Sequence, residues 1–207
     1  MRPTRPVTDP GATPIGPKTA RTRIRRHPER AVPERIEEIL RAGLVAHVAY
    51  IVEGEPRVIP FLYGYEPGRI ILHGAPGSST LGRLRSGVRV AVSVTNLEAL
   101  IASRDAESHS ANYQSAVVYG TTRRVTKAED KRLLLEAMTR RYFPGRTLGR
   151  DYAPATDEQI RSLEVIEVRV EEAAGKARSG GPLGPRDADS DAPGSAGIYP
   201  LSGIAPD

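Results

Sequence analysis

The part of the chain best suited to chemistry is residues 69–87, where a predicted strand ends at His73 and Gly74 and a turn follows. The turn leads into a predicted helix that opens on three hydroxyl residues: Ser78, Ser79 and Thr80. Hydroxyls and free backbone N–H groups then meet the positive end of the helix dipole, an arrangement that favours a phosphate group. N-capping by Ser79 or Thr80 accounts for the same residues, so both interpretations stay open.

Histidine is the side chain that most readily moves protons near neutral pH, and the chain has four. His73 ends a predicted strand beside the turn, where it is either a packed structural residue or a group that moves a proton. His109 lies in a polar stretch before another predicted strand and is either solvated or placed over the site. No two histidines have the spacing of zinc ligands, so we expect no metal site.

Side-chain patterns typical of hydrolases and nucleotide-cleaving enzymes are missing from the sequence. There is no Gly-x-Ser-x-Gly motif and no P-loop, and residues 74–77 are too short and generic for a dinucleotide fingerprint. The chain has no cysteine, which excludes disulfides, a thiolate nucleophile and cysteine metal ligands. We therefore expect any catalysis to depend on a bound cofactor.

Charge and composition favour anionic ligands over nucleic acid. The formal net charge is +5 and the isoelectric point is about 9.7, which attracts groups such as phosphates. Arginines cluster early, at positions 21, 23, 25, 26, 30 and 35. No nucleic-acid-binding motif accompanies them, and aromatic residues make up 5% of the chain with no tryptophan, so a solvated basic arm is the preferred interpretation.

Nothing in the sequence indicates a membrane protein. No run approaches the roughly 20 apolar residues of a membrane span. The basic start lacks the apolar stretch of a signal peptide. We therefore expect a cytoplasmic protein with no membrane partner.

Short strands dominate the predicted secondary structure. Alternating apolar residues and tight turns indicate strands at 44–52, 57–65, 69–73, 88–94, 99–103, 115–125 and 163–170. Proline at the start and glycine past the end of an apolar stripe predict a helix over 33–43. Two capping-box patterns, Thr126 with Glu129 and Thr156 with Gln159, predict a helix that runs to Tyr142 and a second, short helix.

This order of elements predicts a mainly β fold. Tight turns force antiparallel neighbours, so we expect a closed or nearly closed barrel with peripheral helices. Composition divides the chain into a flexible arm over 1–20, a compact domain over 21–178 and a Gly/Pro-rich tail over 179–207. The tail is either disordered or docked, since residues 198–201 are apolar enough to fold back.

Several short motifs resemble the pyridoxamine 5′-phosphate oxidase-like, FMN-binding split-barrel family, and more closely its nitroimidazole-reductase-like branch. The motifs are residues 23–31, 58–63, 72–75, 77–80, 109–120, 176–180 and 196–201. Each one is short, and the resemblance rests on their combination. It extends over residues 21–201.

The resemblance implies a six-stranded antiparallel split barrel that forms a homodimer, with FMN in a cleft between the subunits. Backbone groups of one strand would line the isoalloxazine: Val58, Ile59, Pro60 and Phe61. His73 and Gly74 would lie beside the ring or the ribityl chain, and Ser78, Ser79 and Thr80 would hold the phosphate. Further cofactor-binding candidates come from other strands and from the second subunit: Asn112, Tyr113, Ser115 and Lys176.

One departure from the family affects the phosphate site. Pyridoxamine phosphate oxidase carries an Arg-Lys pair for the FMN phosphate where this chain has Ser79 and Thr80, which argues against pyridoxamine phosphate as the substrate. Another basic residue must then balance the charge, and the candidates are Arg25, Arg30, Arg83, Lys176 and Arg178.

The function that the resemblance implies is that of an FMN-dependent oxidoreductase. It would transfer hydride or electrons between NADH or NADPH and a small organic acceptor or oxygen, with His73 as the catalytic residue. Two alternatives stay open: a non-catalytic flavin-binding or redox-sensing module, and a haem- or deazaflavin-binding member of the same fold.

Overall fold

The computed structural model describes residues 19–201. The predicted flexible arm, residues 1–20, lies outside the described residues except for its last two. Residues 202–207 of the predicted tail lie outside them as well. Within the described part, no helix is long and apolar enough to cross a membrane.

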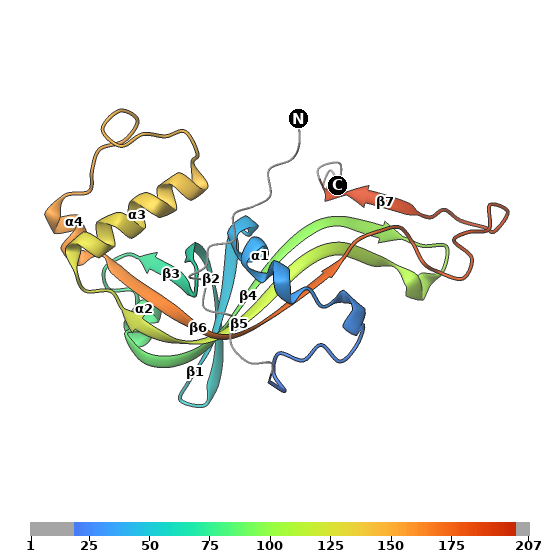
Figure 1. The fold of residues 1–207 in the computed structure, drawn as a ribbon, viewed down its shortest axis with the longest axis horizontal. Helices are drawn as coiled ribbons and strands as arrows, with labels where there is room; N and C mark the ends of the chain where they lie inside the picture. Colours follow the sequence, from blue (N-terminus) through green and yellow to red (C-terminus); the bar gives the residue numbers. More distant parts are fainter. Residues whose placement is uncertain (1–18, 202–207) are drawn as a thin grey trace.

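Six strands form a closed antiparallel ring. They are β1 (Val45–Val52), β2 (Glu55–Glu66), β3 (Arg69–Gly74), β4 (Ser86–Ala102), β5 (Ser110–Arg124) and β6 (Glu164–Arg178). The pairing order is β1-β2-β3-β6-β5-β4, and pairing of β1 with β4, from Ala46 opposite Val94 to Ala49 opposite Ala91, closes the ring. The predicted mainly β fold with a six-stranded antiparallel barrel is confirmed (Figure 1).

Two helices add apolar side chains to the interior of the barrel. In α1 (Ile36–Ala42), the buried residues Ile36, Ile39 and Leu40 face the inward side chains of the strands. In α2 (Ser79–Arg83), Leu81 is buried in the same core. This single core fixes the ends of β3 and β4, between which α2 lies in the chain.

A third helix covers only part of the outer surface of the barrel. Leu134 and Met138 of α3 (Ala128–Tyr142) pack against Ile71 of β3 and Val165 of β6 in a second buried apolar cluster. The short helix α4 (Asp157–Ser162) lies next to α3 at the same end of the molecule (Figure 1). Outward-facing apolar side chains of β1, β2 and β4 stay exposed.

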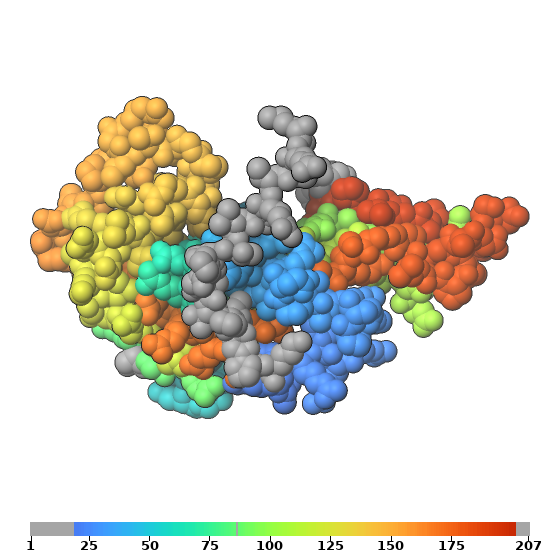
Figure 2. Space-filling model, viewed as in Figure 1, coloured from blue at the N-terminus to red at the C-terminus, as the bar shows by residue number. Residues whose placement is uncertain are grey.

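At the other end, β4 and β5 continue beyond the ring as a long curved arm, along which the tail returns (Figure 1). β7 (Gly197–Pro200) pairs with the end of β4. The carboxylate of Asp187 accepts hydrogen bonds from the backbone N–H groups of Arg104, at 2.7 Å, and Gly184, at 2.6 Å. Residues 179–201 are therefore docked, and Figure 2 shows them as a red lobe opposite the lobe that contains α3.

The arm makes several strands longer than predicted. The predicted strands 88–94 and 99–103 form the single strand β4, because a register shift between Leu97 and Ala99 bends the strand without ending it. β5 begins at Ser110 rather than 115, and β6 continues to Arg178 rather than 170. In the arm, pairing between these strands and with the tail keeps residues extended even where their own sequence pattern is too irregular to predict a strand.

One of the two predicted capping boxes is wrong. α3 begins after Lys127, one residue later than a box of Thr126 and Glu129 requires, and no side chain caps it. The reason is that the chain remains hydrogen-bonded to β6 up to position 125. The box of Thr156 and Gln159 at α4 is confirmed, since each side chain bonds the backbone N–H of the other.

Candidate functional site

The turn after β3 folds tightly over the end of the strand. His73 and Gly74 lie opposite Val165 and Glu164 of β6. A Cβ atom added at Gly74 would lie 2.8 Å from Cδ1 of the fully buried Leu81, so glycine lets α2 pack this closely. The turn is therefore held in one position beside the strand end.

The three hydroxyl residues of this turn have different roles. Ser78, rather than Ser79 or Thr80, caps α2: its Oγ accepts a hydrogen bond from the backbone N–H of Leu81 at 3.3 Å. Ser79 is exposed and Thr80 is half-buried, and neither hydroxyl is hydrogen-bonded within residues 19–201. Capping thus occupies one hydroxyl and leaves two available to a ligand.

The imidazole of His73 carries a polar atom without a partner. His73 lies on the outer face of β3 with Ile71, and its Nδ1 is buried with no hydrogen bond to any described residue. Burial lowers the pKa of His73, so the ring is neutral near pH 7. Because an unsatisfied buried polar atom costs about 1–3 kcal/mol, this nitrogen is suited to bond a polar ligand.

Next to His73, the strand β2 has an edge without a partner strand. β1 pairs with β2 from Glu55 to Leu62, whereas β3 pairs with β2 only from Tyr63 to Glu66. The edge of residues 58–61 that faces away from β1 therefore has no strand beside it in the described structure. Val58 and Pro60 face outward, while Ile59 and Phe61 pack toward the core, so a ligand here meets mainly backbone.

Asn112 fastens the tail to the arm. Its Oδ1 accepts a hydrogen bond from Nη1 of Arg178 at 2.6 Å, and its Nδ2 donates to the carbonyl of Gly180 at 3.1 Å. Arg178 is 7% exposed and also donates to the carbonyl of Gly181. Within a single chain, both side chains have a structural role.

The remaining predicted residues lie far along the arm. Ser115 is opposite Lys176, and its hydroxyl donates to the Lys176 carbonyl at 3.3 Å, while Tyr113 lies two residues further out on the same face. Gly74 is opposite Glu164, so the two groups are separated by the stretch of β6 from 164 to 176, about 40 Å along the strand at about 3.3 Å per residue. One chain does not bring them together.

Sequence reasoning missed an apolar outer surface, which we call the open face. It consists of Val45, Ile51, Val58, Leu62 and Leu97, each between 38% and 62% exposed. Val45 is opposite Leu62, and β1 also pairs with β4, so the strands that carry these residues are adjacent. The signal in the sequence is that three of the four outward-facing residues of 45–52 are apolar, as well as the inward-facing ones, which is typical of burial on both sides.

Among the basic candidates, Arg83 lies nearest to the turn along the chain. It lies four residues after Ser79 on α2, on the same side of the helix. It is exposed and forms no ion pair within the described residues. Among the other candidates, Arg30 lies 3.9 Å from Glu29, and Arg178 is bound to the tail.

Comparison with known proteins identifies a family. The sequence model described as pyridoxamine 5′-phosphate oxidase matches residues 33–177, which is more than half of the chain. No curated protein is significantly similar in sequence. Among solved structures, the FAD and haem binding protein from Mycobacterium smegmatis is 30% identical, with a TM-score of 0.72 and 81% of each chain covered.

Two further structures share the fold. The flavocytochrome from Azotobacter vinelandii is 24% identical with a TM-score of 0.77, over 91% of this chain and 88% of the other. A candidate 5-nitroimidazole antibiotic resistance protein from Bacteroides thetaiotaomicron is 25% identical with a TM-score of 0.57, over 70% and 85%. The barrel described above is therefore the fold of proteins whose names record flavin and haem binding.

Proposed function

Because this chain belongs to the pyridoxamine 5′-phosphate oxidase family, we propose that it binds FMN between two copies of itself and acts as an oxidoreductase. The reaction moves hydride or electrons between NADH or NADPH and a small organic acceptor or oxygen. The observation that carries the proposal is the buried, unpartnered Nδ1 of His73 beside the unpaired edge of β2. A planar ring with polar edge atoms supplies hydrogen-bond partners to this nitrogen and to the backbone of the β2 edge.

The residues present fit a flavin nucleotide at both ends. The backbone edge of residues 58–61 can bond the polar rim of the ring, and Val58 and Pro60 offer it an apolar surface. At the other end, the free hydroxyls of Ser79 and Thr80 and the charge of Arg83 suit a phosphate. Gly74 keeps the turn close to the strand, so both ends belong to one continuous site.

Two observations support a homodimer. The open face exposes five large apolar side chains on adjacent strands, which is typical of an interaction surface. In addition, Tyr113, Ser115 and Lys176 lie too far along the arm to reach the turn of their own chain. A second copy would cover the open face and bring its arm to the first copy's turn.

The catalytic contribution of the chain is position and hydrogen bonding. A bound flavin supplies the two-electron chemistry that the side chains lack. His73 is neutral because burial lowers its pKa, so it can donate a hydrogen bond from one ring nitrogen and accept one at the other. In this role it orients the acceptor or moves a proton during turnover.

Flavin binding tests the proposal directly. The purified protein is titrated with FMN and, separately, with FAD, and the change in flavin fluorescence is measured. We expect saturable binding of FMN at one molecule per chain. The Mycobacterium smegmatis relative is named for FAD, and tighter binding of FAD than of FMN would change the proposed cofactor but not the proposed site. If neither flavin binds, the proposal is contradicted.

The electron donor needs a separate measurement. The flavin-loaded protein is mixed rapidly with NADH or NADPH under anaerobic conditions, and the flavin absorbance is followed. We expect bleaching with at least one donor. If neither donor reduces the flavin, the protein is better described as a non-catalytic flavin-binding module.

A second candidate function is haem binding at the end of the arm. The tail and the arm border an open apolar pocket of about 440 Å³, lined in part by Leu100, Ile101, Tyr199 and His109. Nδ1 of His109 donates a hydrogen bond to the carbonyl of Ala106 at 3.1 Å, which leaves Nε2 able to ligate iron. The name of the Mycobacterium smegmatis relative includes haem as well as FAD.

Titration with haemin tests this second candidate. We expect a sharp Soret band at a fixed stoichiometry, loss of the band in His109→Ala and its retention in the control His27→Asn. The control keeps a polar residue at a position whose φ of 57° asparagine tolerates. Unspecific haemin absorbance in all three proteins contradicts a site at His109.

A further inference from the structure

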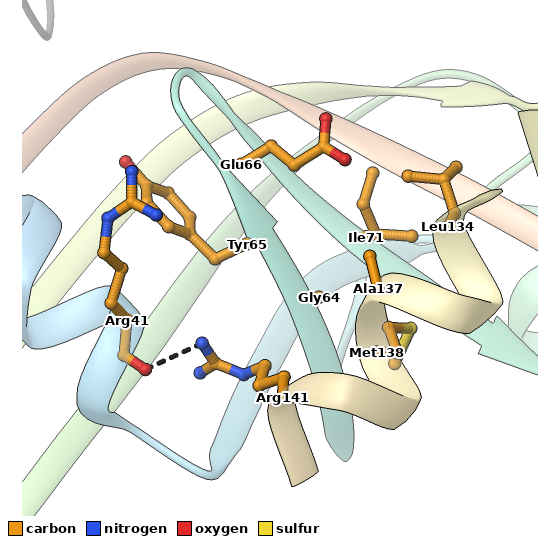
Figure 3. Close-up of a pocket in the computed structure, with 9 residues that line it drawn as sticks. All are labelled: Arg41, Gly64, Tyr65, Glu66, Ile71, Leu134, Ala137, Met138 and Arg141. Carbon is orange, nitrogen blue, oxygen red and sulfur yellow. Dashed lines mark hydrogen bonds between the residues drawn. The ribbon is translucent and has the colours of Figure 1, made fainter. Parts of the chain in front are cut away.

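A second cavity lies between α1, β2 and α3 and includes none of the residues assigned to the flavin (Figure 3). Its volume is about 250 Å³, and sites for small molecules begin at about 300 Å³, so any occupant is small. One wall is apolar, built from Ile71, Leu134 and Met138, each no more than 5% exposed. At Gly64 the β2 backbone lies directly under this wall, since an added Cβ would be 3.0 Å from Cγ of Met138.

On the opposite side of the cavity, Arg141 has a buried donor, its Nε–H, that is not used. Its Nη1 donates to the carbonyl of Arg41 at 2.7 Å, and its Nη2 donates to the carbonyls of Leu40 and Gly43. These bonds fix the guanidinium against the end of α1 (Figure 3). Nε is buried and has no hydrogen-bond partner within residues 19–201, so it lacks the acceptor that a buried donor requires.

Arg41 adds a second, adjustable positive charge to the same side. Its guanidinium lies 5.3 Å above the centre of the Tyr65 ring, and its side chain is 53% exposed. The ion pair that it forms with Glu37 is 3.5 Å long and exposed, so it costs little to rearrange. Arg41 can therefore turn toward an anion in the cavity.

The carboxylate that lines the cavity does not cancel this charge. Glu66 accepts a hydrogen bond from Nε of Arg69 at 2.8 Å, outside the cavity lining. Its negative charge is therefore already balanced. The cavity combines two cationic groups on one side with an apolar wall on the other.

We propose that this cavity binds a small carboxylic acid with an apolar or aromatic body. The carboxylate accepts hydrogen bonds from Nε of Arg141 and from the guanidinium of Arg41, and the body of the acid rests on Ile71, Leu134 and Met138. Charge-assisted bonds of this kind are about twice as strong as neutral ones, so the acid is preferred over its neutral amide. The site is independent of the proposed flavin function.

The methionines make a direct test possible. The chain has two, Met1 and Met138, so protein labelled with ¹³C-methyl methionine gives a signal for Met138 and an internal reference at the start of the chain. The flavin-loaded or flavin-free protein is titrated with phenylacetate and with phenylacetamide. We expect phenylacetate to shift the Met138 signal saturably, and phenylacetamide to bind about tenfold more weakly or not at all.

Variants locate the binding. Ala137 lines the cavity, so Ala137→Leu fills it and should abolish the shift. Arg41→Gln should weaken phenylacetate binding about tenfold, while Arg140→Gln, an exposed arginine on α3 outside the lining, should leave it unchanged. The proposal is overturned if phenylacetate leaves the Met138 signal unmoved at millimolar concentration, if acid and amide bind equally, or if Ala137→Leu binds as the original protein does.

Discussion

At the scale of single residues, burial and hydrogen bonding decide which side chains are free for chemistry. Ser78, Asn112 and Arg178 are all candidates for the cofactor site, but each forms side-chain hydrogen bonds that hold the chain. His73 and Arg141 are the reverse, because each keeps a buried nitrogen without a partner. The first belongs to the proposed flavin site and the second to the acid-binding cavity.

Substitution of His73 tests its catalytic role. His73→Ala should reduce turnover with the preferred nicotinamide about 100-fold, because the proton or hydrogen bond from the imidazole is lost. FMN should remain bound, since backbone and phosphate contacts hold most of it. His27→Asn is the control. Steady-state rates are measured on the flavin-loaded variants. An unchanged rate in His73→Ala rules out a catalytic role for His73.

Glu164 shows how a buried charge is kept stable in the barrel. Its side chain is 3% exposed and bonds Arg85 at 2.9 Å and Arg124 at 2.5 Å. Burial alone raises the pKa of Glu164, but the two arginines outweigh this effect and the pKa lies below its ordinary value. The ion pairs therefore stabilise the fold most at a pH above the pKa of the unfolded glutamate, about 4.3.

Glu164→Gln should lower the free energy of unfolding at neutral pH by about 1–3 kcal/mol. The difference from the original protein should shrink as the pH falls below the unfolded pKa of about 4.3 and through the lowered pKa of folded Glu164, because protonation then removes the same charge. Urea unfolding at several pH values measures both. Glu171→Gln is the matched control, as this glutamate on the same strand is 37% exposed and lies 3.9 Å from Arg89. If both variants lose the same free energy of unfolding, the stabilising role of the Glu164 ion pairs is contradicted.

At the scale of elements, α2 separates a structural hydroxyl from a binding one. The cap at Ser78 supports the helix, whereas the hydroxyl of Ser79 is exposed and belongs to the proposed phosphate site. Ser78→Ala should lower the free energy of unfolding by about 1 kcal/mol, and Ser79→Ala should leave it unchanged while weakening FMN binding. Thermal unfolding without flavin and fluorescence titration with it distinguish the two. If Ser79→Ala binds FMN as tightly as the original protein, the phosphate is held elsewhere.

Elements with a strong local pattern could be predicted from the sequence. Alternation of apolar residues located β1, β2 and β3 within two residues at each end, because their turns are tight and their patterns regular. The bend in β4 and the length of β5 and β6 could not be predicted, since pairing in the arm overrides the local pattern. The start of α3 was misplaced because bonds to the sheet, rather than Thr126, decide where the helix begins.

At the scale of the whole molecule, the proposed second copy would account for both the open face and the arm. Leu62 of the open face is 54% exposed, and Leu133 of α3, which is not part of that face, is 59% exposed. Leu62→Glu should convert a dimer to a folded monomer, because a buried unpaired carboxylate is costly at an interface. Leu133→Glu should remain dimeric. Light scattering after gel filtration gives the mass, and a dimeric Leu62→Glu would place the interface elsewhere.

Residue spacing alone could locate only the turn half of the proposed site, whereas residues 58–61 were named through the resemblance to the family. The turn at residues 73–80 is continuous in the chain, so His73, Ser79 and Thr80 could be grouped from their spacing. The unpaired edge of β2 depends on where β3 stops pairing, and the open face depends on which outer surface α3 covers. Both are decided by tertiary packing, which single strands do not encode.

The central claim is that two copies of the chain hold the flavin between them. Native mass spectrometry of the protein mixed with FMN tests it most directly, because one spectrum reports the number of chains and of flavins in each complex. The account predicts a dimer that carries two FMN molecules, and loss of bound FMN from the monomer formed by Leu62→Glu. A monomer that binds FMN as tightly as the dimer, or a dimer that binds none, would contradict it.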